Sequence, residues 1–163
     1  MKKYFFIPFF MFSIFAVAQN FDGKGDQKLQ IGANLQDNAS GIMISYDHGL
    51  GQNISVGLVT GYALDVNDLV DADFVDRINL RARFNANIGE VLNIDENLDI
   101  YPGIGLSLKN FGGHLGFRYF LSDGFGIYTE FETPFAKYKT GDLNPAESIN
   151  NQFAVSFGAV FNL

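Results

Sequence analysis

The chain has 163 residues, of which 18% are charged and 47% hydrophobic, with 18 glycines, 18 phenylalanines and no cysteine. The hydrophobic content is too high for a disordered chain, and the lack of cysteine excludes a disulfide scaffold, a thiolate zinc site and a lipidated N-terminal cysteine. The net charge of −7 argues against nucleic acid as a partner, because phosphate backbones are bound by basic surfaces.

Residues 1–18 have the pattern of a secretory signal peptide. Two lysines precede an apolar run over Tyr4–Phe15, and Ala16–Ala18 has the small-x-small form of a cleavage site. A membrane anchor is the alternative, but the apolar run is shorter than the roughly 20 residues that a spanning helix needs. We therefore predict that the mature chain begins at Gln19.

The rest of the chain is predicted to form one domain with many β-strands. A short N-terminal segment, 19–26, precedes the folded part, 27–163, in which apolar and polar residues alternate with period two. Each run of alternation is about ten residues long, close to the 9–11 that a bilayer-spanning strand needs. No helix is expected outside the signal peptide. The eight runs are 29–36, 41–47, 54–64, 77–88, 98–109, 114–121, 125–135 and 152–163.

The links between these runs are predicted to lie alternately at two ends of the domain. One end carries the links around Gly49, Asp123 and, more loosely, 93–97. The other carries the links around Asn38, 65–73, Asn110 and 136–150. Two links of the second group are long, as expected for the extracellular end of an outer-membrane barrel.

Alternation alone fits both a membrane barrel and a soluble barrel such as a lipocalin. The glycines favour the membrane barrel, because half of the 18 fall on the polar face, where a narrow lumen would need small residues. We therefore predict a closed antiparallel eight-stranded up-and-down transmembrane β-barrel. Its lipid-facing residues are predicted to include Leu80, Phe84, Ile104, Phe117, Phe131, Phe157 and Phe161.

Aromatic residues near both ends of the apolar face support the same prediction. Membrane barrels carry such girdles at the two interfaces of the bilayer. The first predicted girdle contains Tyr46, Tyr119, Phe125 and Phe161, and the second contains Tyr62, Phe74, Phe135 and Phe153.

The pattern over Gln27–Leu163 resembles the small eight-stranded outer-membrane barrels of the OmpX or OmpA-transmembrane-domain type. The last run is similar to the C-terminal signal that the barrel-assembly machinery recognises, although it ends in Leu163, with Phe161 two positions earlier. The resemblance implies a monomer in the outer membrane of a Gram-negative bacterium, in contact with lipopolysaccharide and other outer-membrane lipids. The loops are expected to be presented to other envelope proteins or to a host surface.

Charged residues on the polar face are predicted to meet inside the barrel. Unpaired charges in a confined space are costly, so they should form ion pairs or bind water. One interpretation is a structural network that closes the lumen, and the other is an ion-selective constriction of a narrow pore. The predicted lumenal residues are Arg77, Arg81, Arg83, Lys109, Arg118, Asp47, Asp99, Glu130 and Glu132.

Two loops could either bind a ligand or partner or be ordinary surface loops. Five aspartates lie within 65–76, but they lack the order of a calcium-binding loop, so we expect a solvated acidic loop without metal. The link 136–150 is long enough to be a contact surface, and a variable loop is an equal alternative.

Enzymes of the resembled family act on lipid A, some through a His/Ser pair. His48 is predicted near the periplasmic end, while His114 and Ser107 face inward without the orienting acid that a serine nucleophile needs. We therefore predict a protein that is not an enzyme and binds no cofactor, with a structural or interaction role. A narrow pore is the alternative, and a lipid A-modifying enzyme is the third interpretation.

Overall fold

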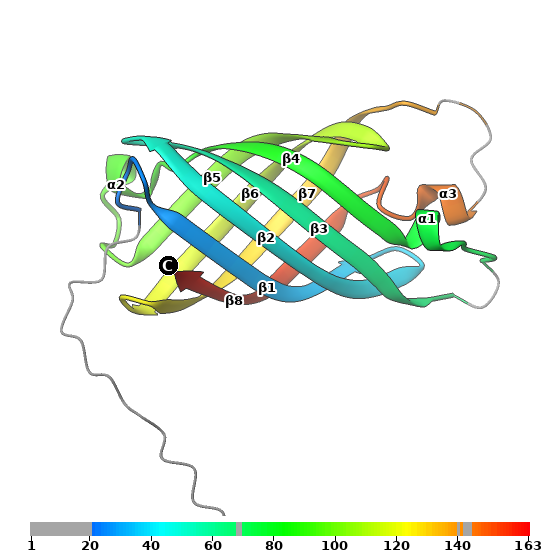
Figure 1. The fold of residues 1–163 in the computed structure, drawn as a ribbon, viewed down its shortest axis with the longest axis horizontal. Helices are drawn as coiled ribbons and strands as arrows, with labels where there is room; N and C mark the ends of the chain where they lie inside the picture. The colour runs from blue at the N-terminus through cyan, green and yellow to red at the C-terminus, as the bar shows by residue number, and fades with distance from the viewer. Residues whose placement is uncertain (1–20, 68–69, 140, 142–144) are drawn as a thin grey trace, which may run out of the picture.

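A computed structural model describes residues 21–67, 70–139, 141 and 145–163, so the predicted signal peptide lies outside the described residues. Eight strands form one closed barrel (Figure 1). The strands are β1 (Gln27–Gln36), β2 (Ala39–Gly51), β3 (Ile54–Val66), β4 (Ile78–Ala86), β5 (Leu98–Ser107), β6 (Asn110–Ser122), β7 (Phe125–Lys137) and β8 (Ala154–Asn162).

Each strand pairs antiparallel with its neighbours in sequence, and β8 returns to pair with β1 from Lys28↔Asn162 to Gln36↔Ala154. Closure removes sheet edges, so that backbone polar groups along the strands find partners within the sheet. The terminal end of the barrel carries the C-terminus and the links β2–β3, β4–β5 and β6–β7. The loop end carries the other four links (Figure 1). The predicted alternation of the links is confirmed.

The expectation of no helix beyond the signal peptide is wrong. Among the described residues of the links are three helices of four residues each: α1 (Phe74–Arg77), α2 (Gly89–Leu92) and α3 (Pro145–Ser148). They are too short to show a helical period. α1 is defined instead by a capping box, in which the Asp73 N–H donates to Asp76 Oδ2 at 3.2 Å. None of the described helices has the length and hydropathy needed to cross a membrane.

The outer face of the barrel is apolar. Leu80 is 49% exposed and Phe84 is 43% exposed, whereas Arg81 between them is only 2% exposed. Of the other residues predicted to face lipid, Ile104, Phe131 and Phe157 are exposed and Phe117 and Phe161 half-buried. This arrangement is the reverse of a soluble barrel and is that of a membrane barrel.

Aromatic residues form pairs toward both ends of the outer face. At the terminal end the rings of Phe125 and Phe161 have centroids 5.6 Å apart. Toward the loop end, Tyr62 pairs with Phe74 at 5.6 Å. Such rings suit the interfacial zones of a bilayer, where one side is apolar and the other is wet.

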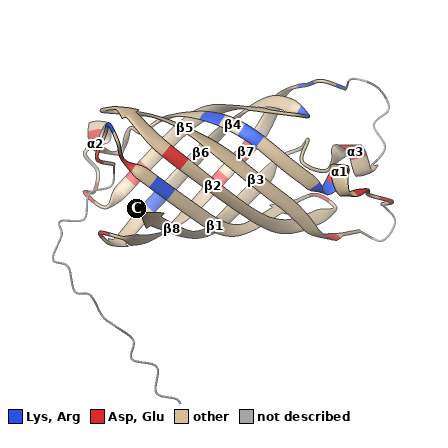
Figure 2. Cartoon of the chain, viewed as in Figure 1, with Lys and Arg blue, Asp and Glu red and all other residues tan. Residues whose placement is uncertain are grey.

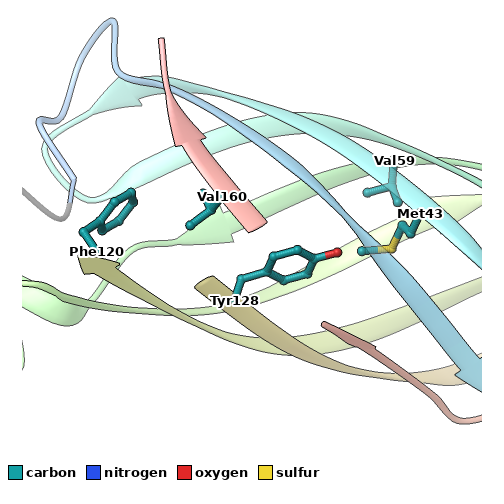
Figure 3. Close-up of a cluster of buried hydrophobic side chains, with 5 residues drawn as sticks. All are labelled: Met43, Val59, Phe120, Tyr128 and Val160. Carbon is teal, nitrogen blue, oxygen red and sulfur yellow. The ribbon is translucent and has the colours of Figure 1, made fainter. Parts of the chain in front are cut away.

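Part of the lumen is filled by apolar side chains. Figure 3 shows Met43, Val59, Phe120, Tyr128 and Val160, which come from five different strands and are all buried. The Tyr128 ring points along the lumen toward Met43. The interior is therefore packed by an apolar cluster as well as by the charged groups described next.

Candidate functional site

Arg83 on β4 is the centre of an ion-pair network across the lumen. Its Nε and Nη2 donate to the two carboxylate oxygens of Asp47 on β2, each at 2.7 Å, and its Nη1 donates to Glu130 Oε2 on β7 at 2.7 Å. Nη2 also donates to Gln30 Oε1 on β1 at 2.7 Å and to Ser45 Oγ at 2.9 Å. The bidentate pair fixes the guanidinium plane, and the remaining contacts join it to the other strands.

Arg118 on β6 continues the network toward the terminal end. It forms an ion pair with Asp47, so that carboxylate serves two arginines, and its Nη1 donates to Asp99 Oδ2 at 3.1 Å. Its guanidinium lies 3.7 Å from the centroid of the Tyr101 ring. The Tyr101 hydroxyl accepts a hydrogen bond from Gln30 Nε2 at 2.9 Å. Figure 2 shows acidic and basic positions close together on the strands between the two ends.

Glycines on the lumenal face leave the space that this network occupies. A Cβ at Gly57 would clash with the Asp47 carboxylate, and a Cβ at Gly116 would clash with the Tyr101 ring. These two glycines, which belong to the set that indicated a narrow lumen in the sequence, therefore lie directly beside side chains of the network.

A second layer lies nearer the loop end. Arg81 forms an ion pair with Glu132, and its Nη2 donates to Asn110 Oδ1 at 3.1 Å. Asn110 in turn donates from Nδ2 to Asn151 Oδ1 at 3.0 Å. These contacts connect β4 to β7 and β6, and connect β6 to Asn151 in the segment that precedes β8.

The N-terminal segment covers the terminal end. Lys28 Nζ is 2.6 Å from Asp26 Oδ1 and 5.8 Å from the centroid of the buried Phe21 ring. The Gly25 N–H donates to the Gly49 carbonyl at 2.9 Å, and the Gly49 N–H donates to the Asp26 carbonyl at 2.8 Å. These bonds hold the segment against the end of β2.

The structure brings seven of the nine predicted lumenal residues into these layers: Arg81, Arg83, Arg118, Asp47, Asp99, Glu130 and Glu132. Arg77 and Lys109 were predicted among them, and for these two the prediction is wrong. Arg77 belongs to α1 and donates from Nε to the Ala72 carbonyl at 3.2 Å, while Lys109 Nζ donates to the carbonyls of Asp76 and Ile149 at 2.7 and 3.2 Å. The reason is that β4 begins after Arg77 and β5 ends before Lys109, so both lie at the loop end.

Several network members were missed in the sequence: Lys28, Gln30, Ser45, Tyr101 and Asn110. Gln30, Ser45 and Tyr101 fall on the polar face of the alternation, so the orientation of their side chains was predictable. Their partners were not, because these depend on the register between strands.

Two of the residues considered for catalysis, His114 and Ser107, have structural partners. His114 Nε2 is 2.8 Å from Asn85 Oδ1, and Ser107 Oγ donates to the Asn110 carbonyl at 3.1 Å. Within the described part of the chain, no three His, Asp or Glu side chains are grouped to hold a metal ion. Of the acidic loop, Asp76 caps α1, and residue 68 lies outside the described residues.

Comparison with known proteins shows the fold and the family. A structure from the de novo design of transmembrane β-barrels matches 88% of this chain and 99% of its own, with a TM-score of 0.59 and 10% identity. The outer membrane protein Ail of Yersinia pestis, in a phospholipid bilayer nanodisc, matches 86% of this chain and 100% of its own, with a TM-score of 0.48 and 13% identity. No curated protein sequence matches. The likeness to the designed barrel shows that the fold is a transmembrane β-barrel. Residues 10–163 match DUF6646, a family of unknown function, and the chain belongs to that family.

Proposed function

We propose that the protein is a monomeric outer-membrane barrel with a structural or interaction role in the envelope of a Gram-negative bacterium. The apolar outer face would contact the outer-membrane lipids, lipopolysaccharide among them, and the barrel-assembly machinery would insert the chain. The long links at the loop end would face the cell exterior, where envelope or host-surface proteins could bind them. No catalytic step is part of this proposal.

The observation that carries the proposal is the layered filling of the lumen. Along the barrel lie the Lys28–Asp26 pair, the network around Arg83 and Arg118, and the Arg81 layer. A barrel of about eight strands has an interior just wide enough for its own side chains. An ion crossing it would have to separate several buried ion pairs, so a closed lumen is favoured over a pore.

Single-channel recording in planar lipid bilayers tests the closed lumen. We expect the purified mature protein to give no discrete current steps, because the ion pairs span the interior. A porin in the same apparatus is the positive control. Insertion is checked separately by gel mobility, which should differ between boiled and unboiled samples, since the closed barrel resists detergent. Reproducible current steps from the folded protein would instead support the narrow pore.

The proposed outer-membrane location implies that the signal peptide, residues 1–18, is removed. We expect the protein purified from membranes to begin at Gln19, because Ala16–Ala18 matches the small-residue pattern before a cleavage site. Intact-mass measurement gives the answer directly. A membrane-inserted protein that retains Met1 would contradict this prediction.

A further inference from the structure

The seam between β4 and β5 is the shortest in the barrel. Its register pairs run only from Arg81↔Ser107 to Asn85↔Gly103. The loop-end residues of β4, Ile78–Leu80, all pair with β3, but none of them has a register partner among the described residues of β5. The two strands therefore separate before they reach the loop end.

A tight turn after β5 causes the separation. Ser107 Oγ accepts hydrogen bonds from the N–H groups of Lys109 and Asn110, at 3.1 and 2.9 Å. A serine that binds main-chain groups of the next residues ends a strand, because it offers the backbone an alternative to the sheet. The chain thus turns into β6 instead of continuing beside β4.

A cavity of about 220 Å³ lies where the strands separate. A dry apolar cavity of about 150 Å³ holds benzene, so this space is large enough for a segment of hydrocarbon chain. Leu80, on the outer face of β4, is 49% exposed, and Leu108, in the turn after β5, is 78% exposed, so the cavity lies beside the lipid-facing surface. The apolar walls are Val75, Ile78, Leu80, Leu108 and Tyr138.

Two lysines, Lys109 and Lys139, border the same cavity. The Lys109 ammonium has three donors, of which two bind main-chain carbonyls, and no carboxylate of the described residues lies within ion-pair distance of it. The bordering acids are already engaged: Asp76 caps α1, and Glu147 accepts from Lys139 Nζ at 2.8 Å. Partial burial lowers the pKa of Lys109, so a neighbouring anion would stabilise its charged form.

We infer that this cavity holds an acyl chain of lipid A, the membrane-embedded part of lipopolysaccharide, with a lipid A phosphate at Lys109 and Lys139. The inference rests on the proposed outer-membrane location and loop-end exposure. At that end, the opening would face the outer leaflet, where hydrocarbon meets the apolar walls. The phosphate would lie at the level of the headgroups, where it supplies the anion that Lys109 lacks.

The test counts lipids on the folded mature chain. The protein is reconstituted in phosphatidylcholine nanodiscs that contain either purified lipid A or phosphatidylglycerol, and retained lipids are counted by native mass spectrometry. We expect one lipid A to be retained per barrel. Lys109→Gln should weaken its retention about fivefold, as expected for the loss of one partly exposed charged contact. Leu108→Trp and, from the opposite wall, Leu80→Trp should remove it by filling the cavity.

Matched control variants distinguish binding of lipid A in the cavity from unspecific binding of lipid to the outer face of the barrel. Lys137→Gln removes an exposed lysine outside the cavity, and Leu106→Trp places the same ring two residues earlier on the outer face. Both should retain lipid A at the wild-type level. Equal loss in the control and cavity variants, or equal retention in all of them, would overturn the inference, and so would retention of phosphatidylglycerol or phosphatidylcholine in place of lipid A. Gel mobility of unboiled samples reports barrel insertion independently, so a failure of the proposed function is seen separately.

Discussion

Replacing Arg83 by methionine is expected to lower the free energy of unfolding by about 3–5 kcal/mol, the cost of removing one partner of a buried ion pair. The variant removes the bidentate partner of Asp47 and the ion pair of Glu130, while both carboxylates stay buried. Methionine keeps most of the side-chain volume, so the loss would reflect charge more than packing. Urea unfolding in lipid vesicles, followed by the mobility of unboiled samples, measures the change.

Arg77→Met is the matched control, because Arg77 lies at the loop end and its guanidinium binds main-chain carbonyls. Its effect should stay below about 1 kcal/mol, as for other partly exposed groups. Adding Glu130→Gln to Arg83→Met should recover part of the lost stability, because Glu130 then loses the buried charge that Arg83 had paired, whereas Asp47 still pairs with Arg118. Equal effects of Arg83→Met and Arg77→Met would show that the lumenal network contributes nothing specific to stability.

Placing arginine at Leu58 is expected to cost about 2–4 kcal/mol, because the cation would meet hydrocarbon near the middle of the bilayer. Leu58 lies on the outer face of β3, opposite Ala82 in the middle of β4. Unfolding from vesicles measures the cost, and the same variant in detergent micelles shows how much of it depends on the bilayer.

Leu64→Arg provides a control on the same strand and face. Leu58 and Leu64 are both 60% exposed, so water around the barrel would make the two substitutions equivalent. In a bilayer, Leu64 lies toward the loop end, where the cost of arginine falls to about 0–1 kcal/mol. Equal costs at the two positions would contradict the membrane location and favour a barrel in water.

The orientation of the side chains is a local property, and the sequence determined it. Successive residues of a strand point to opposite faces, so the alternation around Arg81 and Arg83 was enough to place them inward and Leu80 and Phe84 outward. The abundance of glycine on the inward face then indicated a narrow interior. Alternation did not give the strand ends. β5 ends at a turn in which Ser107 accepts main-chain hydrogen bonds, and a four-residue helix with Asp73 as its N-cap precedes β4, so Lys109 and Arg77 lie outside the lumen.

What only the tertiary structure decided is which residues meet. Period-two alternation gives the face of each residue but not its height relative to the next strand, and a register shift of two residues preserves the pattern while changing every partner. The sharing of Asp47 by Arg83 and Arg118 therefore depends on the registers that connect β2, β4 and β6 around the barrel. The cavity beside Leu108 has the same origin, because it exists only where β4 and β5 stop pairing. Local chemistry thus fixed the inside and the outside, and long-range pairing fixed the network and the cavity.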